Sequence, residues 1–179
     1  FTKNNKTKRY KKSRGNILIF GKNSDLGNFT YNYLTSKGYK VKYFEGYFKN
    51  LQTANSLLNI YLNKKIDYIF YFLTKKIIPF KKNYDFENFK IFRIICKFFS
   101  KKNIKIFYPS SKFIEINQPQ FRNYIQSKLK AEKFIDSYKN KKIKYYRLPQ
   151  LKTSQTYSLF KGFQGQDIKI MTKYLDEFI

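Results

Sequence analysis

The sequence contains no histidine, no tryptophan and a single cysteine, Cys96. Without histidine the chain has no imidazole to bind a metal or to act as a general base, and one cysteine cannot form a disulfide within the chain. A structural zinc site and histidine-based catalysis are therefore excluded, and we expect no metal ligands. Cys96 lies in an apolar stretch, where we expect a small buried side chain.

Long apolar runs are also missing. The densest apolar stretch, Ile66–Leu73, is short and is interrupted by Asp67. A membrane-spanning helix needs about 20 consecutive apolar residues. We therefore expect no transmembrane segment, and the length of 179 residues fits one domain with a sizeable core.

Acidic residues are scarce, because 11 Asp and Glu stand against 38 Lys and Arg, for a net charge of +27. The abundance of Lys, Asn, Ile, Phe and Tyr indicates an A/T-rich genome. Such a codon bias does not by itself explain the shortage of acids, because Asp and Glu codons are also available. So large a charge opposes a compact fold unless a polyanion neutralises it, and nucleic acid usually does so. RNA is therefore an expected partner.

Residues 1–14 carry charge of one sign, and no acid precedes Asp25. The segment has no apolar stripe, so it is typical of neither a secretory signal nor an amphipathic transit helix. A solvated tail and a basic arm that orders on RNA both fit the pattern, and the charge density favours the arm. The RNA contacts expected in this arm are Lys3, Lys6, Lys8, Arg9, Lys11, Lys12 and Arg14.

The stretch Asn16–Glu45 predicts a strand, a glycine-containing turn, a helix and a second strand. Asn16–Phe20 is an apolar run of the kind that a buried parallel strand needs. An amphipathic helical pattern follows, and Gly38 is typical of the residue just after a helix. Tyr39–Phe44 then predicts the second strand.

Glycines and one acid occupy the positions that a dinucleotide site requires. Glycines at 21 and 27, with Ser24 between them, would let the backbone approach a pyrophosphate at the helix N-terminus. Glu45 follows the second strand, where a carboxylate accepts hydrogen bonds from the ribose hydroxyls. The alternative is an ordinary βαβ unit without a ligand. The cofactor contacts expected are Gly21, Ser24, Leu26, Gly27 and Glu45, with NAD or NADP as the cofactor.

Strand and helix patterns alternate up to Pro149. Further strands are predicted at 67–73, 104–108 (ending at Pro109) and 143–148, and helices at 53–63, 86–99, 123–139 and 168–178. The alternation implies right-handed crossovers and a parallel sheet covered on both faces. We therefore expect an α/β fold, a Rossmann-like doubly wound parallel sheet. The expected parts are a basic arm (1–14), a dinucleotide-binding domain (15–149) and a short C-terminal extension (150–179).

With these elements placed, the chain resembles the extended short-chain dehydrogenase/reductase family, the NAD-dependent epimerase/dehydratase group. The resemblance covers about residues 15–149. The family's Gly-x-x-Gly-x-x-Gly turn has Ser24 at its middle position here, and Glu45 matches its acid after the second strand. The short connection at Asn50-Leu51 is similar to that of sugar-nucleotide reductases.

The most specific match begins at Tyr124. The segment Tyr-Ile-Gln-Ser-Lys-Leu-Lys-Ala-Glu, from Tyr124 through Lys128 to Glu132, looks like the family's Tyr-x-x-Ser-Lys-x-x-x-Glu helix. A bare Tyr-x-x-x-Lys arises by chance in a chain this rich in both residues, as a second copy at 138–142 shows, so the added residues carry the match. Ser111 matches the family's serine after the preceding strand.

The resemblance implies a catalytic set of Ser111, Tyr124 and Lys128. Lys128 would bind the nicotinamide ribose and lower the pKa of Tyr124. Tyr124 would act as general acid or base on a substrate hydroxyl or carbonyl, and Ser111 would hold that oxygen.

Two departures from the family count against catalysis. The segment between Ser111 and Tyr124 is unusually short. The family also places its substrate-binding lobe after the strand that matches Ile143–Leu148, and the residues from Gln150 to Ile179 are too few for most of that lobe. We therefore expect a Rossmann-like fold that lacks most of its substrate lobe; a lobe on another polypeptide, or in residues beyond Ile179, is the alternative.

The charge and these departures favour a non-catalytic function. We expect a structural, RNA-contacting component of a large assembly, above all an organellar ribosome of the mitochondrial matrix, with ribosomal RNA and neighbouring proteins as partners. One alternative is an NAD(P)-dependent oxidoreductase or epimerase acting on a nucleotide sugar, and another is a nucleotide-binding accessory subunit of a respiratory complex. Outside the arm, the RNA contacts expected are Lys101, Lys102, Lys141 and Lys142.

Overall fold

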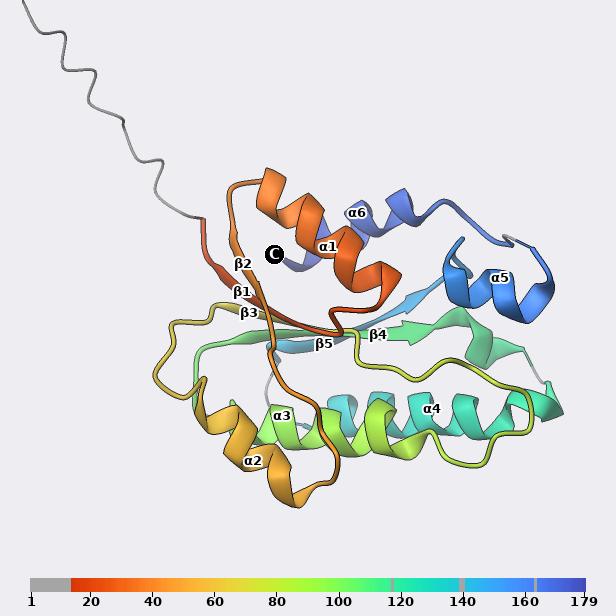
Figure 1. Cartoon of the computed structure of the whole chain (residues 1–179), viewed down its shortest axis with the longest axis horizontal. Coiled ribbons are helices and arrows are strands. Elements are labelled where there is room, and N and C mark those ends of the chain that lie inside the picture. Colours follow the sequence, from red (N-terminus) through yellow and green to blue (C-terminus); the bar gives the residue numbers. More distant parts are fainter. Residues whose placement is uncertain (1–13, 117, 139–140, 163) are drawn as a thin grey trace, which may run out of the picture.

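The computed structural model describes residues 14–116, 118–138, 141–162 and 164–179. Five parallel strands form its central sheet in the order β2-β1-β3-β4-β5, which confirms the predicted Rossmann-like α/β class (Figure 1). The order reverses between β1 and β3, the place where open α/β sheets bind ligands. The strands are β1 (Asn16–Phe20), β2 (Lys40–Tyr43), β3 (Tyr68–Tyr71), β4 (Lys105–Ser111) and β5 (Ile143–Leu148).

Helices cover both faces of the sheet. In Figure 1, α1 and α6 lie on one face and α2, α3 and α4 on the other, while α5 lies near the carboxyl ends of the strands. No helix in the described ranges combines the length and apolar character needed to cross a membrane. The helices are α1 (Asp25–Ser36), α2 (Gln52–Asn59), α3 (Phe92–Phe98), α4 (Arg122–Ser137), α5 (Ser154–Phe160) and α6 (Met171–Phe178).

Alternation along β1 builds two apolar cores, one on each face. Ile17 and Ile19 join the cluster under α1 and α6, whereas Leu18 and Phe20 join the cluster under α2, α3 and α4. Successive strand residues point to opposite faces, and a parallel strand buried on both faces is therefore apolar throughout. Cys96 is fully buried, as predicted, and lies in the cluster under α2, α3 and α4.

The predicted end of β4 at Pro109 is wrong, because the strand continues to Ser111. β3 pairs with β4 only as far as Phe107, while β5 stays paired with β4 to its end. Beyond Phe107 one side of β4 therefore has no neighbouring strand. The missing N–H of Pro109 breaks no ladder there, so proline is tolerated.

Residues 150–179 contain more structure than the single helix predicted at 168–178. That helix is present as a short 3₁₀ turn, Ile168–Ile170, followed by α6. The helix α5 was not predicted. The ring of Phe178 packs against Phe70 and Phe107, with centroids 5.3 and 5.4 Å apart. α6 is thus part of the cover of the sheet.

The predicted helix 53–63 is shorter than expected, since α2 ends at Asn59. Ile60 and Leu62, two apolar residues of the predicted helical pattern, are 58% and 45% exposed. Only Ala54 and Leu58 of α2 are fully buried, so this helix contributes little to the core.

Replacing Gly27 with alanine should destabilise the fold. A Cβ on Gly27 would lie 2.3 Å from the carbonyl oxygen of Gly21 and would force α1 away from β1. We expect Gly27→Ala to lower the free energy of unfolding by about 2–3 kcal/mol, measured by urea denaturation. Gly38→Ala is the matched control, because a Cβ there meets no atom within 4 Å and only its positive φ costs about 1 kcal/mol. Equal losses in the two variants would contradict this account.

Candidate functional site

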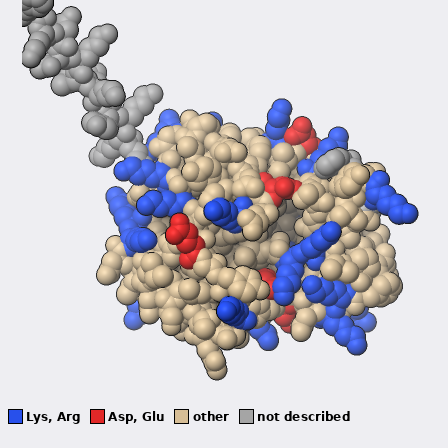
Figure 2. All heavy atoms as spheres, in the orientation of Figure 1, with Lys and Arg blue, Asp and Glu red and all other residues tan. Residues whose placement is uncertain are grey.

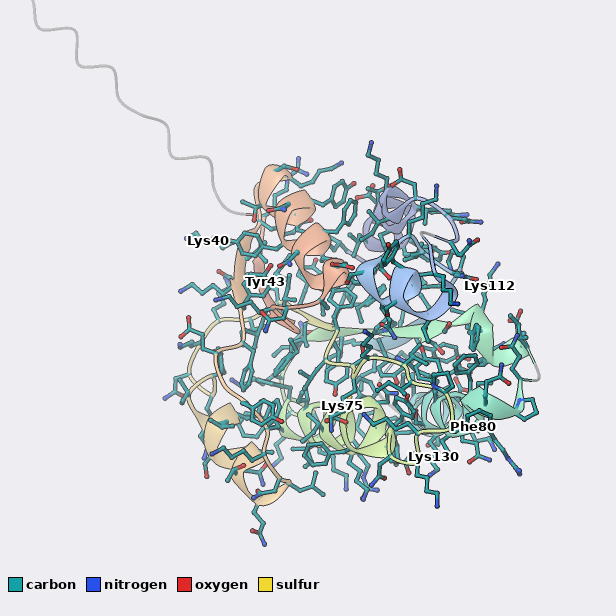
Figure 3. All side chains as sticks on the ribbon, turned by 45° about the vertical axis from the view of Figure 1, so that its right-hand side comes forward. Lys40, Tyr43, Lys75, Phe80, Lys112 and Lys130 are labelled. Atoms are coloured by element: carbon teal, nitrogen blue, oxygen red, sulfur yellow. The ribbon has the colours of Figure 1, made fainter. Side chains whose placement is uncertain are left out.

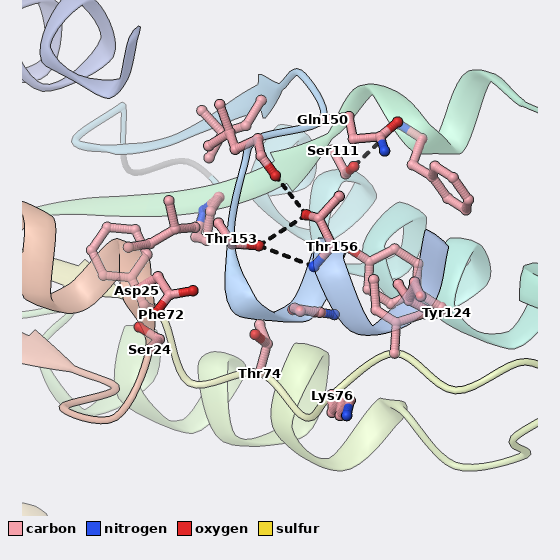
Figure 4. Close-up of a pocket in the computed structure, with 18 of the residues that line it drawn as sticks. Ser24, Asp25, Phe72, Thr74, Lys76, Ser111, Tyr124, Gln150, Thr153 and Thr156 are labelled. Atoms are coloured by element: carbon pink, nitrogen blue, oxygen red, sulfur yellow. Dashed lines mark hydrogen bonds between the residues drawn. The ribbon is translucent and has the colours of Figure 1, made fainter. Parts of the chain in front are cut away.

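A cleft of about 460 Å³ opens at the carboxyl ends of the strands. Its volume is within the range of small-molecule sites. Figure 4 shows residues from the start of α1, the loop after β3, the end of β4, α4 and the region of α5 converging on it. Among its lining residues are Ser24, Asp25, Leu26, Phe72, Lys76, Ser111, Lys112, Tyr124, Lys128, Gln150 and Thr153.

The glycine turn folds as the sequence pattern predicts. Gly21 has φ +106°, a left-handed conformation that favours glycine, and a Cβ on it would lie 2.6 Å from the backbone of Phe72. The turn can therefore pass directly over the end of β3. This close approach places the N-terminus of α1 at the cleft, with Leu26 in its wall.

Ser24 is the N-cap of α1. Its Oγ accepts a hydrogen bond from the Gly27 N–H (2.9 Å) and donates one to the Gly21 carbonyl oxygen (2.9 Å). A serine followed by a helical pattern is a common capping signal. The residue that replaces the family's middle glycine therefore satisfies one of the free N–H groups of the helix itself.

Asp25, in the first turn of α1, was not predicted as a site residue. Its Oδ2 accepts hydrogen bonds from the backbone N–H (2.6 Å) and the hydroxyl (2.8 Å) of Ser154 at the start of α5. The bond joins the two helix N-termini across one end of the cleft. Sequence reasoning missed it because the partners are 129 positions apart.

Glu45 lies at the same edge of the sheet but does not line the cleft. It follows β2, its side chain is exposed, and its backbone N–H donates to the Tyr61 hydroxyl (2.9 Å). The structure thus brings Ser24 and Leu26 to the cleft and leaves Glu45 beside it.

Ser111 and Tyr124 meet in the cleft wall. Tyr124 is 7% exposed, and burial raises the pKa of its hydroxyl to about 12, although a hydrogen bond with Ser111 acts in the opposite direction. The ring of Tyr84 packs edge-on against it, with centroids 5.7 Å apart. At neutral pH the Tyr124 hydroxyl is therefore protonated.

Lys128 lies one helical turn from Tyr124 and is 2% exposed. Its Nζ donates to the Pro109 carbonyl oxygen (2.8 Å) and lies 5.8 Å from the centroid of the Tyr124 ring. Burial lowers the pKa of Lys128 to about 7, although Glu132 acts to raise it. The resemblance implied that Lys128 lowers the pKa of Tyr124. In this structure burial outweighs any such effect, and the pKa of Tyr124 is raised.

Glu132, the last residue of the matched motif, ties α4 to the sheet. Its carboxylate accepts from the Ser110 hydroxyl and from Nε (3.1 Å) and Nη2 (2.8 Å) of Arg147 on β5. The side chain is 4% exposed. A buried carboxylate with several donors holds α4 in a fixed position over β4 and β5.

Asn88 is a buried polar residue that sequence reasoning missed. The predicted helix 86–99 begins as a π-helix, Phe86–Ile91, and π-helical turns are frequent at functional sites. Asn88 Nδ2 donates to Ser127 Oγ (2.9 Å), and the Asn88 backbone carbonyl accepts from the Tyr108 hydroxyl (2.8 Å). Its Oδ1 is buried without a partner among the described residues. The sequence does not single out Asn88, because the same stretch also contains Glu87, Lys90 and Arg93.

The predicted RNA contacts lie away from this cleft. Lys101, Lys102 and Lys142 line one hollow near the amino-terminal ends of β4 and β5, and Lys141 lines a neighbouring one. Arg14 begins the described chain, and its backbone N–H donates to the Gly38 carbonyl oxygen (3.3 Å). The predicted contacts Lys3, Lys6, Lys8, Arg9, Lys11 and Lys12 lie outside the described residues.

Solved structures share this architecture. A putative short chain dehydrogenase from Escherichia coli CFT073, complexed with NADPH, matches with a TM-score of 0.67 and 12% identity over 91% of this chain and 90% of that chain. The fold is that of the short-chain dehydrogenases. A short chain dehydrogenase from Burkholderia cenocepacia J2315 in complex with NADP gives a TM-score of 0.69 and 13% identity over 90% and 82% of the two chains.

A third similar structure is 4-hydroxyisoleucine dehydrogenase complexed with NADH, with a TM-score of 0.66 and 14% identity over 90% of this chain and 88% of that chain. No protein-family model matches the sequence, and no curated protein matches it. The likeness supports the fold, and the epimerase/dehydratase branch stays a prediction.

The buried Lys128 should make stability depend on pH. Its folded pKa lies below its ordinary value of 10.5, so between the two values the unfolded chain binds more protons. The free energy of unfolding therefore rises with pH above about 7, by up to about 1 kcal/mol per pH unit. Urea denaturation between about pH 7 and 8.5 should show this rise in the native chain and lose it in Lys128→Met. Lys130→Met, on the exposed side of α4, should keep it, and an unchanged slope in Lys128→Met would contradict the assignment.

Proposed function

We propose that this protein binds a nicotinamide dinucleotide and transfers a hydride between it and a small carbonyl or alcohol compound. One observation carries the proposal. Ser111, Tyr124 and Lys128, which come from β4 and α4, line the same cleft as the N-terminus of α1. These are the side chains that the family resemblance assigns to acid–base chemistry beside such a cofactor.

The residues of the cleft fit a dinucleotide. Gly21 lacks the Cβ that would collide with Phe72, which lets the turn bring the α1 N-terminus to the cleft, and a helix N-terminus attracts phosphate. Lys76 and Lys112 add positive charge to the lining. The Asp25 carboxylate opposes this attraction, and its charge weakens the site without filling the cleft.

The chain's own groups would handle a proton and an oxygen atom. A nicotinamide supplies or accepts the hydride when it is bound. The Tyr124 hydroxyl, with a pKa of about 12, is protonated at neutral pH and would donate its proton to a carbonyl oxygen that Ser111 holds. This protonation state favours reduction of a carbonyl over oxidation of an alcohol.

Lys128 would bind the ribose next to the nicotinamide. With a pKa of about 7, its amine is close to half protonated at neutral pH, so a nearby phosphate or a deprotonating tyrosine would draw a proton to it. Glu45, exposed after β2, would repel a 2′-phosphate and favour NAD over NADP. A nucleotide sugar also carries hydroxyl groups that such a site could oxidise. Its oxidation, reduction or epimerisation is therefore a narrower form of the same proposal.

The other expected functions stay predictions. A structural role in a mitochondrial ribosome, with ribosomal RNA and neighbouring proteins as partners, rests on the charge of the chain, and a role in a respiratory complex rests on the retained fold. The likeness to dehydrogenases crystallised with NADPH, NADP and NADH supports the oxidoreductase proposal better than either.

Replacing Tyr124 should lower the rate of the reaction without weakening the binding of the reduced cofactor. Titration with NADH and NADPH, followed by nicotinamide fluorescence, should show binding of at least one of them. Tyr124→Phe should bind within about twofold of the native chain, because the ring remains. Its rate of NADH oxidation with a panel of small aldehydes and ketones should fall by about 100-fold or more. Tyr39→Phe, at the opposite edge of the sheet, is the control, and binding of neither cofactor by the native chain would refute the proposal.

Removing the Asp25 charge should tighten cofactor binding. Asp25→Asn keeps an oxygen to accept from Ser154 but removes a negative charge at the phosphate-binding helix end. Two unit charges about 4 Å apart in water interact by about 1 kcal/mol, which corresponds to roughly fivefold in affinity. Asp136→Asn, an exposed change of the same charge on α4, should leave the NADH affinity unaltered. Weaker NADH binding in Asp25→Asn would show that the Ser154 bond matters more than the charge.

A further inference from the structure

The dinucleotide cleft has one polar end and one apolar end. In Figure 4, Ser24 and Asp25 lie at one side of the cleft, and Ser111 and Tyr124 lie at the other. The hydrogen bonds that Ser154 donates to Asp25 close the polar end. The end beside Tyr124 is lined by aliphatic and aromatic side chains, which are Ile77, Phe113, Ile116 and Leu159.

The short segment between Ser111 and Tyr124 supplies the first apolar wall. Ser111 Oγ accepts a hydrogen bond from the Phe113 N–H (3.1 Å) and caps a 3₁₀ turn, Lys112–Glu115. This turn places the Phe113 ring beside the Tyr124 ring, with centroids 6.5 Å apart. Ile116 follows the turn, lines the cleft and is 45% exposed. The segment that follows Ser111 therefore presents hydrocarbon to the cleft.

The loop after β3 supplies a second apolar wall. Ile77 lines the cleft. The next residue, Ile78, is held by the Tyr84 hydroxyl, which accepts from its backbone N–H (2.5 Å) and donates to its carbonyl oxygen (2.9 Å). The Tyr84 ring in turn packs edge-on against Tyr124, with centroids 5.7 Å apart. Ile77 is therefore anchored near the same tyrosine as Phe113.

Helix α5 changes from polar to apolar along the cleft. Ser154, at its start, bonds Asp25, and Gln155 lines the cleft in the same turn. Leu159 lies one turn further along the same face as Gln155 and lines the cleft as well. The helix therefore presents polar groups near the N-terminus of α1 and hydrocarbon further from it.

Exposed apolar side chains surround the apolar end. Ile78, Phe80, Ile116 and Tyr157 are between 45% and 76% exposed. The Phe80 N–H donates to the Gln120 carbonyl oxygen (2.7 Å), which ties the loop after β3 to the segment before α4. Apolar groups that stay exposed together are typical of ligand-binding grooves.

The charged residues of the lining do not define the apolar end. Among the described residues they are Asp25, Lys76, Lys112 and Lys128. Asp25 lies at the polar end, and Lys128 is buried against the Pro109 carbonyl oxygen. Lys76 and Lys112 are exposed, so their ammonium groups can stay in water while their methylene groups cover apolar surface.

The two remaining views agree with this division. Figure 3 shows Lys112 and Phe80 on one side of the molecule, and Lys40 and Tyr43 on the other. Figure 2 shows Lys and Arg scattered over a face that is mostly uncharged. Positive charge is thus spread over the surface, whereas hydrocarbon gathers at one end of the cleft.

We propose that the end of the cleft beside Tyr124 binds the hydrocarbon part of an apolar aldehyde or ketone. The inference rests on the proposed hydride transfer, because it names the substrate class of that site. A sugar hydroxyl moved from water onto such walls loses hydrogen bonds that they cannot replace. Each buried methylene group, in contrast, contributes about fourfold in affinity. The walls therefore favour an apolar carbonyl compound over a nucleotide sugar.

The reaction at this end would be a reduction. The carbonyl carbon would receive the hydride, which leaves NADH as NAD⁺. The carbonyl oxygen would receive the proton of the Tyr124 hydroxyl, and water would return a proton to the tyrosine. An aldehyde would leave the cleft as a primary alcohol and a ketone as a secondary alcohol.

A series of aliphatic amides tests the apolar end without any reaction. Unbranched amides from butanamide to octanamide have the carbonyl group of a substrate but do not accept a hydride from NADH. Their affinities for the full chain would be measured by isothermal titration calorimetry, with and without NADH. Each added methylene group should tighten binding by about threefold to fourfold.

Ile116→Ala shortens one wall at an exposed position, where the change should not disturb folding. The ratio of the octanamide affinity to the butanamide affinity should fall by at least about threefold. Ile60→Ala is the matched control, because Ile60 is an exposed isoleucine outside the lining. This control should keep the native ratio. Leu159→Ala should act in the same direction as Ile116→Ala.

Three results would overturn the proposal. They are no binding of any amide by the native chain, equal affinity for all the amides, and equal effects of Ile116→Ala and Ile60→Ala. Amide binding that tightens with chain length, without reduction of any aldehyde, would refute hydride transfer and keep the apolar site. Reduction of glyceraldehyde by NADH as efficiently as octanal would keep hydride transfer and refute the apolar site.

Discussion

A buried polar contact between α4 and the end of β4 is the constraint on which the site depends. Lys128 Nζ donates a hydrogen bond to the Pro109 carbonyl oxygen, and Glu132, one turn further, accepts from Ser110 and Arg147. Buried charges are tolerated only when such partners are present. Together these bonds fix the height and rotation of α4 over the sheet, and that rotation turns Tyr124 toward Ser111. An apolar helix face alone would leave the rotation free.

Much of the fold could be predicted from local pattern. β1 and β5 were placed to the residue because their apolar runs end at glycine or proline, and Gly38 indicated where α1 ends. The errors come from distant partners. β4 can pass through Pro109 because β3 has already ended beside it. α5 lacks the apolar periodicity from which a helix is predicted.

The site shows the same division between local and distant information. Ser111, Tyr124 and Lys128 were predicted from a motif, and they do meet in one cleft. The motif could not give the raised pKa of Tyr124, which follows from burial by residues such as Tyr84. Nor could it give the contact of Asn88 or the hydrogen bonds that Ser154 donates to Asp25, since each depends on a helix from elsewhere in the chain.

The place of α6 has a consequence for how the chain folds. Met171, Leu175 and Phe178 complete the apolar cluster over β1, β3 and β4, and the Tyr33 hydroxyl bonds Asp176, 143 positions away. Contacts so distant in sequence form late and slow the search for the native state. The part of this face that α6 covers therefore stays exposed to water until α6 docks, and in a chain emerging from the ribosome the rings of Phe70 and Phe107 would lack the cover of Phe178 until α6 is made.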